Sequence, residues 1–386
     1  MHHRTQGKGV EAVHLLGIKE GLESLDHQVS IASPLGIEVS HTIQEAPSAS
    51  STRIMSTFSK YAPQVIFEFL EICNNFTAAK TLERLRNEHG CDILYERFAL
   101  LNWIGAFKAK SWGAKFVVEV NYTTDSPLGI RHKTKLFAGL ARRIERFTYE
   151  QADLLLPVSS TLANELLAKG YPEEKILISP NAVHPEKFPL LVKDHKLSHK
   201  LGLRDGLTIG YVGGFAPWHG LEILIEAVAQ IPKSRNTLNL LLIGDGPTMD
   251  IVRALAERFR DRFRILTPGR IEHFNLPSYL SIMDIMVMPN SNNYGSPMKI
   301  FEYMASGKPV VAPDYQPLRD VIKDETDGLL FRPNNPQPLA RVLEKLIQNP
   351  ELRQRLGNNA RQRVLQEHNW KNRTIRIVDR LLTLTV

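Results

Sequence analysis

The pattern that most constrains the fold of this chain is an alternation of short apolar runs with amphipathic helical segments along almost its whole length. Most of the apolar runs are continuous rather than interrupted by polar residues at every second position. Continuous runs are typical of parallel strands covered on both faces, whereas half-exposed antiparallel strands alternate. Strands that alternate with helices in this way predict an α/β fold made of doubly wound parallel sheets.

The expected strands fall into two groups, which indicates two sheets. The first group comprises residues 28–33, 93–95, 115–120, 154–158 and 175–179, and the second comprises 207–212, 238–243, 263–267, 285–289, 309–312 and 328–331. A chain of 386 residues with 43% hydrophobic side chains is long enough to bury two such cores. We therefore predict a first domain over residues 1–190, a polar linker over 191–206 and a second domain over 207–368.

The beginning of the sequence lacks one expected element. The segment Met1–Gly9 is typical of a loop that follows a first strand, and it leads directly into a helix predicted over Val10–Leu25. A central parallel strand is difficult to omit from a doubly wound core, so we expect the recorded sequence to start downstream of the natural start. The alternative is a first sheet that lacks its central strand.

Charge narrows the class of function. Residues 1–190 carry 21 basic and 21 acidic side chains, whereas residues 191–386 carry 27 basic and 20 acidic ones, so the second half holds the whole net charge of +7. This excess favours an anionic ligand in the second half, although a generally basic surface explains it equally well. The sequence contains no nucleic-acid-binding module and no basic segment interleaved with aromatics, so we expect no nucleic-acid partner.

Cysteine content and hydropathy bear on location. Cys73 and Cys91 are too few for a disulfide framework or a zinc site, and they fit a reducing compartment. The sequence has no uncharged apolar run of about 18 residues, which a membrane-spanning helix would need. It also opens without a signal segment, so we expect a cytoplasmic protein.

A glycine-rich loop follows the first strand of the second group. Gly213 and Gly214 would let backbone N–H groups approach an anion closely, and His219 could add a donor. The alternative is a turn that merely packs Trp218.

Two further loops follow the next two strands. Gly244-Asp-Gly246 resembles half of a dinucleotide fingerprint, but Met249 stands where the third glycine should be. We therefore interpret this loop as a turn and expect no nicotinamide cofactor. The loop Gly269-Arg270-Ile271 could hydrogen-bond the edge of a base, or it could be a simple turn.

A helix later in the second group has an unusual first turn. Ser296 is expected to cap it and Pro297 to occupy its first position. Lys299 opposes the helix dipole unless an anion lies between them, and Glu302 lies one turn further on the same face. A phosphate at Lys299 and sugar hydroxyls at Glu302 would explain this pair. The alternative is an ordinary surface Lys–Glu pair.

At these segments the sequence resembles the family-4 retaining glycosyltransferases, whose GT-B architecture consists of two Rossmann-like domains facing a central cleft. The resemblance covers most of the chain and rests on motifs in the family's order: Gly7–Gly9, Asp26–Val29, Val158–Ser160, Ser179–Val183, Tyr211–Gly214, Gly244–Gly246, Gly269–Arg270 and Phe301–Val310. Each motif alone is weak, whereas their order and spacing together are specific. The resemblance also implies that residues 369–386 form a helix that crosses back to the first domain.

The resemblance implies roles for residues of the second domain. Glu302 would bind the ribose of a nucleoside diphosphate sugar and Lys299 would lie near the diphosphate, and we expect both to be catalytic. Gly213 and Gly214 would border the phosphates, and Arg270 with Ile271 would frame the base. The full set expected to bind the donor is Gly213, Gly214, His219, Gly269, Arg270, Ile271, Gly295, Ser296, Pro297 and Met298.

Three positions depart from the family pattern. Tyr294 stands in place of the first of two paired glutamates. Gly214 and His219 stand in place of the arginine and the lysine of the phosphate loop. We interpret Lys299 as the replacement charge, and the alternative is impaired or altered use of the donor.

In the first domain the resemblance points to residues beside the donor sugar and the acceptor. Glu119, near the end of an expected strand, takes the place of a family histidine and is expected to be catalytic. Gly7, Gly9, Arg97 and Asn121 are expected on the acceptor or donor-sugar side. A solvated Glu119 and an Arg97 engaged in a structural pair are the alternatives.

The implied reaction is the transfer of a hexosyl group to a hydroxyl, with retention of configuration, in polysaccharide or glycoconjugate biosynthesis. The sequence has no Asp-x-Asp motif, so we expect metal-independent catalysis and no cofactor. The acceptor would be a carbohydrate or lipid-linked, and a basic helix expected over Leu128–Thr148 would rest on an anionic membrane or simply pack in the core. The alternatives are a catalytically impaired nucleotide-sugar-binding protein and a GT-B-type epimerase or hydrolase.

Overall fold

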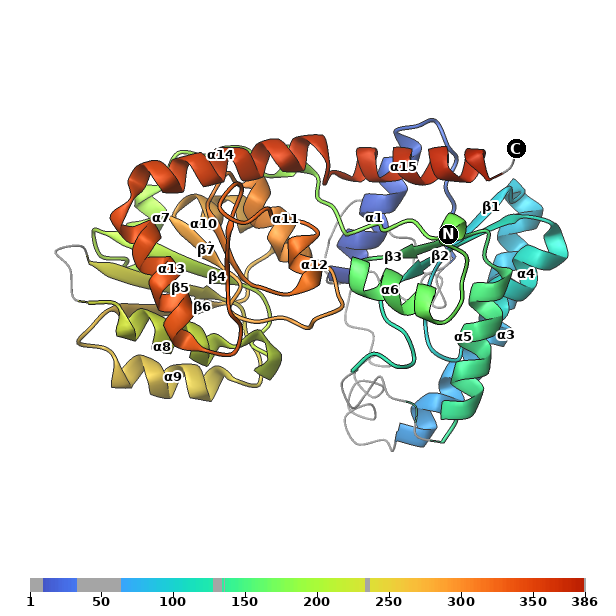
Figure 1. The fold of residues 1–386 in the computed structure, drawn as a ribbon, viewed down its shortest axis with the longest axis horizontal. Coiled ribbons are helices and arrows are strands. Elements are labelled where there is room, and N and C mark those ends of the chain that lie inside the picture. Colours follow the sequence, from blue (N-terminus) through green and yellow to red (C-terminus); the bar gives the residue numbers. More distant parts are fainter. Residues whose placement is uncertain (1–9, 33–63, 128–133, 135, 233–236, 385–386) are drawn as a thin grey trace. The chain divides into compact units, whose positions relative to one another are not determined.

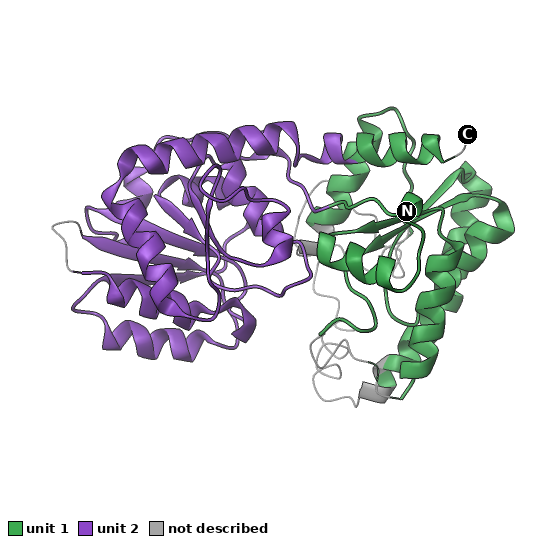
Figure 2. Ribbon diagram, in the orientation of Figure 1, with its two compact units in different colours: residues 1–179, 374–386 green, residues 180–373 purple. Residues whose placement is uncertain are grey.

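The structure is a computed structural model that describes residues 10–32, 64–127, 134, 136–232 and 237–384 (Figure 1). The chain divides into two compact units (Figure 2). Unit 1 comprises residues 1–179 and 374–386, and unit 2 comprises residues 180–373. Each unit contains its own parallel β-sheet, which confirms the predicted α/β fold with a parallel sheet in each of two domains.

Unit 1 is built on three described strands in the order β1-β2-β3, all parallel. The strands are β1 Ile93–Arg97, β2 Lys115–Val120 and β3 Leu154–Pro157, and the helices are α1 Val10–Glu23, α3 Gln64–His89, α4 Ile104–Trp112, α5 Ala138–Gln151 and α6 Ser160–Ala168. Strands β2 and β3 are buried along nearly their whole length, as their continuous apolar sequences predict.

Two strands expected in unit 1 form only in part. Ile176 makes a single bridge to Leu155, and Leu177 and Ser179 donate their N–H groups to carbonyls of β3. A 3-10 turn at Glu173–Lys175 directly precedes this segment, so little extended chain is left to pair. In the expected strand 28–33, only Ala32 forms a bridge, and residue 33 lies outside the described residues.

A cavity of about 240 Å³ lies along the edge of β1. Its walls come from residues 28–30 and 32, from β1, and from apolar side chains of α3 and of the C-terminal helix α15 Trp370–Thr383, among them Leu82, Leu85, Ile377 and Leu381.

The basic helix expected over Leu128–Thr148 is shorter in the structure. Residues 128–133 and 135 lie outside the described residues, and α5 begins at Ala138. Ala141 and Ile144 are buried within unit 1, whereas Leu136 and Leu140 are exposed, so α5 packs in the core through part of its apolar face only.

Unit 2 contains a six-stranded parallel sheet in the order β6-β5-β4-β7-β8-β9. The strands are β4 Leu207–Val212, β5 Leu238–Ile243, β6 Arg264–Gly269, β7 Ile285–Val287, β8 Val310–Pro313 and β9 Leu329–Phe331. Every strand expected in the second group is present, with small shifts at the ends. The strand order reverses at β4, which pairs with both β5 and β7, so the sheet is doubly wound.

Helices cover both faces of this sheet because successive side chains of each strand point in opposite directions. One core contains Ile209 and Leu240 and packs under α8 Leu221–Gln230, α9 Met249–Arg258 and α13 Pro336–Gln348. The other contains Leu241 and Met286 and packs under α10 Leu276–Ser281, α11 Met298–Ala305, α12 Gln316–Arg319 and α14 Pro350–Gln366.

Helix α14 approaches the end of α11 without an intervening side chain. A Cβ on Gly357 of α14 would lie 2.1 Å from the carbonyl oxygen of Gly307, which follows α11. Only glycine permits this approach. The contact fixes the far end of the helix that carries Lys299 and Glu302.

The predicted linker at 191–206 is not a linker. It contains the helix α7 His195–Leu201, which is capped by Asp194 and ends at Gly202 with φ 75°. Leu197, Leu201 and Leu203 pack against the core of unit 2, and the unit begins at Pro180 rather than at residue 207. A helix of seven residues is too short to show a clear periodic pattern in the sequence.

The last helix divides between the units. Residues 370–373 of α15 belong to unit 2, and residues 374–386 belong to unit 1. Within unit 1, Arg380 donates a hydrogen bond to the carbonyl of Glu174 (2.9 Å). The helix therefore begins one residue after the expected start at 369 and contributes residues to the first unit.

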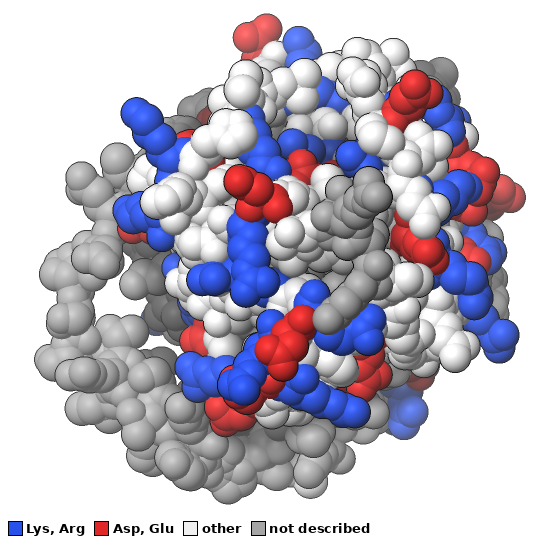
Figure 3. Space-filling view, turned by 90° about the vertical axis from the view of Figure 1, so that its left-hand side faces the viewer, with Lys and Arg blue, Asp and Glu red and all other residues white. Residues whose placement is uncertain are grey.

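The surface of the molecule carries both signs of charge. On the face shown in Figure 3, basic and acidic side chains are interspersed. Ion pairs such as Arg253–Asp250 and Arg260–Glu257, both exposed, are typical of such a surface in unit 2. Within the described residues, no helix is long and apolar enough to cross a bilayer.

Candidate functional site

The candidate site lies at the carboxyl end of β4, next to the reversal of strand order, where doubly wound sheets bind ligands. The N–H of Gly213 donates to the carbonyl of Ile243 (2.9 Å), and the N–H of Gly244 donates to the carbonyl of Gly269 (2.9 Å). The ends of β4, β5 and β6 are thus joined by backbone hydrogen bonds into one floor.

The turn at Gly244–Gly246 packs against this floor. A Cβ on Gly244 would lie 1.9 Å from the carbonyl oxygen of Gly213, and a Cβ on Gly246 would lie 2.6 Å from that of Phe215. Gly244 and Gly246 therefore need to be glycine because the backbones of the two turns touch. This confirms the interpretation of Gly244–Gly246 as a structural turn.

Lys299 reaches over the floor from the first turn of α11. Its Nζ donates to the hydroxyl of Tyr211 (3.0 Å) and lies 4.5 Å from the centroid of that ring. A Cβ on Gly213 would lie 2.6 Å from the same Nζ, so the ammonium stands directly above this glycine. The Tyr211 hydroxyl in turn donates to the carbonyl of Gly214 (2.8 Å). Lys299 and the glycine loop therefore meet at one place, as the sequence predicts.

The Lys299 ammonium is poorly solvated there. Although the side chain is not completely covered, desolvation lowers the pKa of Lys299 to about 7, against the opposing attraction of Glu302. An anion bound at the ammonium would raise this pKa again, because an opposite charge favours the protonated form. The site is therefore electrostatically suited to a negatively charged group.

His219 forms part of the same cluster. Its Nδ1 is hydrogen-bonded to the carbonyl of Gly214. Desolvation, together with the charge of Lys299, lowers the pKa of His219 to about 4. His219 is therefore neutral at pH 7 and supplies no positive charge to the glycine loop.

Glu302 lies one turn beyond Lys299 and is 8% exposed. Its Oε1 accepts a hydrogen bond from Nε2 of His273 (2.8 Å), and this bond raises the pKa of His273. His273 begins a short 3-10 turn, His273–Asn275, after β6. Sequence reasoning missed His273; the available signal was a histidine three residues beyond Arg270 in a loop that follows a strand.

The turn before α11 differs from the prediction. Pro297 is the N-cap, with an extended ψ of 121°, and the helix begins at Met298, so Ser296 does not cap it. The Ser296 hydroxyl instead accepts from the N–H of Asn181 (3.0 Å), and the Ser296 carbonyl accepts from the Asn181 amide. Gly295 donates its N–H to Oδ1 of Asn292 (2.6 Å). Asn181, which the sequence analysis did not single out, therefore holds this turn.

Arg270 and Ile271 lie in the segment between β6 and the His273 turn. Arg270 is exposed, whereas Ile271 is partly buried against the core of unit 2. In the sequence, both residues precede His273, the hydrogen-bond partner of Glu302. Their expected contact with a base remains a prediction.

In unit 1, the environment of Glu119 rules out the solvated alternative. Glu119 is completely buried, and its Oε2 accepts from the hydroxyl of Tyr95 (2.6 Å). Its Oε1 lies 3.0 Å from Nε2 of His14 on α1 and 3.4 Å from Nε of Arg97. Glu119 joins α1 to the sheet, because its side chain points from β2 into the core. The expected catalytic role of Glu119 remains a prediction.

Arg97 and Asn121 lie beside this network. With its amide turned to satisfy its neighbours, Asn121 donates to the carbonyl of Phe98 (3.3 Å) and accepts from Nε of Arg97 (3.2 Å). Both residues follow strand ends at the carboxyl edge of the unit 1 sheet, which is where the sequence analysis expects them. Gly7 and Gly9 lie outside the described residues.

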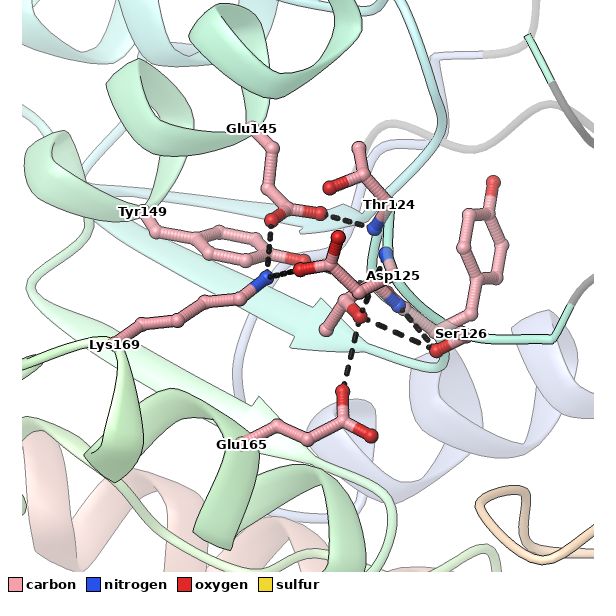
Figure 4. Close-up of polar contacts among 9 residues, drawn as sticks. Thr124, Asp125, Ser126, Glu145, Tyr149, Glu165 and Lys169 are labelled. Atoms are coloured by element: carbon pink, nitrogen blue, oxygen red, sulfur yellow. Dashed lines mark hydrogen bonds and ion pairs between the residues drawn. The ribbon is translucent and has the colours of Figure 1, made fainter. Parts of the chain in front are cut away.

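The loop after β2, residues 121–127, is tied to unit 1 by a polar cluster that sequence reasoning missed (Figure 4). Lys169 bridges Asp125 (2.8 Å) and Glu145 (2.8 Å). Although burial opposes it, the hydrogen bonds that Lys169 donates to Asp125 and Glu145 raise the pKa of Lys169. The Thr123 hydroxyl donates to Glu165 (3.0 Å). The loop is therefore anchored from both α5 and α6.

Comparison with known proteins agrees with this fold. Residues 9–187 match the family model described as Glycosyltransferase Family 4, and residues 194–363 match the model described as Glycosyl transferases group 1. The matches and the two α/β units with parallel sheets place the chain in the GT-B class. The chain belongs to the family-4, group 1 glycosyltransferases, which confirms the resemblance.

Individual relatives are distant. An uncharacterized glycosyltransferase of Methanocaldococcus jannaschii is 25% identical over 240 residues, which cover 62% of this chain and 60% of that protein. The amylovoran biosynthesis glycosyltransferase AmsK of Erwinia amylovora is 28% identical over 207 residues, which cover 52% of this chain and 49% of that protein. The chain therefore spans only part of the length of these curated relatives.

A solved structure shows the same fold. The Anabaena protein HepE in complex with UDP superimposes with a TM-score of 0.69 over 99% of both chains, at 18% identity. Within the described part of our chain, no three His, Cys, Asp or Glu side chains gather as a metal site would require.

The lowered pKa of Lys299 makes stability depend on pH. The folded protein releases this proton near pH 7, whereas the unfolded chain holds it up to its ordinary pKa of 10.5. The free energy of unfolding should therefore rise with pH above about 7, by up to ~1 kcal/mol per pH unit after screening. Urea denaturation at pH 7, 8 and 9 should show a smaller rise for Lys299→Met.

The matched control is Lys345→Met, which removes an exposed lysine paired with Glu325. This variant should keep the wild-type rise. Equal slopes in the two variants would show that Lys299 does not titrate in this range.

Proposed function

We propose that the protein transfers a hexosyl group from a nucleoside diphosphate sugar to a hydroxyl acceptor. The observation that carries this proposal is the poorly solvated ammonium of Lys299 above Gly213, at the amino end of α11. A diphosphate bound there would meet the ammonium, the first-turn N–H groups and the glycine backbone together. UDP is the nucleotide to test first, because the similar Anabaena structure contains it.

The difficult step is the departure of the diphosphate from the sugar. As the bond breaks, positive charge develops on the sugar ring and negative charge develops on the leaving phosphate. Donors already aimed at that phosphate stabilise the transition state, each by ~2–4 kcal/mol. Lys299 would provide the charge that Gly214 and the neutral His219 do not.

Glu302 is proposed to bind the ribose of the donor. A carboxylate accepts hydrogen bonds from two neighbouring hydroxyls, and Glu302 lies on the same face of α11 as Lys299. We further propose that configuration is retained, as the family resemblance implies. The absence of an Asp-x-Asp pair in the sequence supports catalysis without a metal.

Unit 1 is proposed to supply the acceptor site. Asn121, Arg97 and the anchored loop after β2 lie at the carboxyl edge of its sheet. Glu119 is left out of this proposal because it is completely buried. The similarity to AmsK, which is named for amylovoran biosynthesis, supports a carbohydrate acceptor in polysaccharide biosynthesis.

A nucleotide-sugar-binding protein without turnover is the second candidate. Tyr294 and Gly214, which depart from the family pattern, favour it. Donor binding without sugar transfer or UDP release would support this candidate over an enzyme. Release of free sugar without an acceptor would instead favour a hydrolase.

We also propose that unit 1 contacts an anionic membrane. Phe69, Leu70 and Phe76 on α3 are 60%, 54% and 66% exposed. Glu68 of α3 accepts the N–H groups of Leu136 (3.1 Å) and Phe137 (2.8 Å), so α3 adjoins the start of α5 and its exposed arginines. Apolar side chains beside basic ones favour insertion at an anionic lipid surface.

The donor site is tested by two substitutions. Lys299→Ala should weaken UDP binding about 10- to 100-fold, because it removes a charge-assisted hydrogen bond to phosphate, and Glu302→Ala should weaken it about tenfold. Isothermal titration calorimetry measures both. Lys345→Ala is the control and should bind UDP as the wild type does. Unchanged affinity in both site variants would refute the assigned roles.

Metal independence is tested on turnover. With EDTA present, release of UDP from the sugar donor should proceed at the rate seen without chelator, since Lys299 and backbone N–H groups carry the phosphate charge. The assay measures UDP released over time. A complete loss of rate that Mg²⁺ or Mn²⁺ restores would reject this part of the proposal.

Membrane contact is tested by cosedimentation with vesicles of phosphatidylcholine containing about one third phosphatidylglycerol. The double substitution Phe69→Ser with Leu70→Ser should reduce the bound fraction severalfold, because it removes inserted apolar surface. Val192→Ser in unit 2, where Val192 is 90% exposed, is the matched control and should bind as the wild type does. Equal binding of the double variant would count against this surface.

A further inference from the structure

We propose that His273 is a positioning residue of the nucleotide site. It holds one oxygen of the Glu302 carboxylate, so that the other oxygen accepts hydrogen bonds from the ribose hydroxyls. This inference rests on the proposed function, because it concerns the same donor site. It adds a residue from the β6–α10 connection to a site otherwise formed by α11 and the β4 loop.

The two oxygens of Glu302 have different surroundings. Oε1 is bonded to Nε2 of His273 at 2.8 Å. Within the described residues, Oε2 has no hydrogen-bond partner, and it is not among the buried unsatisfied atoms, so it reaches solvent. The Glu302 side chain as a whole is 11% exposed. One oxygen is therefore engaged by the protein, and the other is presented to a ligand.

The imidazole is itself held in place. Phe188, which is 2% exposed, packs edge-on against the His273 ring, with centroids 6.0 Å apart and planes at 81°. The charged groups that face His273 are Glu302 from α11 and Lys187 from the turn before Phe188. The His273 ring therefore lies between the Phe188 ring and the Glu302 carboxylate that it orients.

This arrangement has a consequence for ribose recognition. A glutamate on a helix has several rotamers, and ordering them costs free energy when a ligand binds. A hydrogen bond from the His273 imidazole selects one Glu302 rotamer before the ligand binds. The free energy of ordering this side chain is therefore not lost again on binding. His273 should therefore strengthen the contact with the ribose hydroxyls without touching the nucleotide.

The experiment pairs protein variants with two nucleotides. UDP carries both ribose hydroxyls, whereas 2′,3′-dideoxy-UDP lacks them and keeps the base and both phosphates. His273→Phe retains a ring against Phe188 but removes the donor to Glu302. We expect His273→Phe to weaken UDP binding about tenfold and to leave binding of 2′,3′-dideoxy-UDP unchanged. Calorimetry measures the four dissociation constants.

Two further variants complete the test. His273→Gln keeps an N–H donor and should recover part of the lost UDP affinity. Phe274→Ala changes the next residue of the same turn, which is 74% exposed, and should bind both nucleotides as the wild type does.

The contradicting outcomes are distinct. Equal weakening of both nucleotides by His273→Phe would make His273 merely structural, and no weakening of either would show that Glu302 needs no partner. Both results overturn the inference and leave the donor function standing. Failure of the wild type to bind UDP would instead contradict the proposed function, and the inference with it.

Discussion

The hydrogen bond from Lys299 to Tyr211 is the interaction on which the site of unit 2 depends. It joins the first turn of α11 to β4, and Tyr303 repeats the connection one turn later, where its hydroxyl bonds the N–H (2.8 Å) and the carbonyl (3.1 Å) of Val212. With the helix held in this way, the ammonium stays over Gly213 and away from bulk water. The poor solvation of the Lys299 ammonium thus follows directly from the hydrogen bonds between α11 and β4.

The fold was predictable from the sequence wherever a segment is buried along its whole length. Strands covered on both faces must be apolar throughout, so all of the strands of unit 2 were visible as continuous runs. The boundary between the units was not predictable, because α7 is short and contains only two of the packing leucines, Leu197 and Leu201. The predicted helix cap at Ser296 was also wrong, because the Ser296 hydroxyl accepts a hydrogen bond from the N–H of Asn181 instead.

The candidate site was predictable where its residues share one helix or follow the strands of one parallel sheet. Lys299 and Glu302 are three positions apart, so helical geometry alone places them on one face. His273 and Asn181 are 29 and 115 residues from the side chains that they bond, and no periodicity in the sequence reports such pairings. Glu119 was expected near the ligand from its place at a strand end, but its side chain points inward to Tyr95 and His14.

The close backbone contact between α14 and the end of α11 makes the chemistry of the site depend on Gly357, a residue remote from it. An added methyl at Gly357 would clash with the carbonyl of Gly307, and the displaced helix is the one that carries Lys299 and Glu302, which are proposed to bind the donor. A substitution of Gly357 would therefore reduce activity in a cell and not only impair folding. Selection on ligand use would in this way preserve a residue that no ligand reaches.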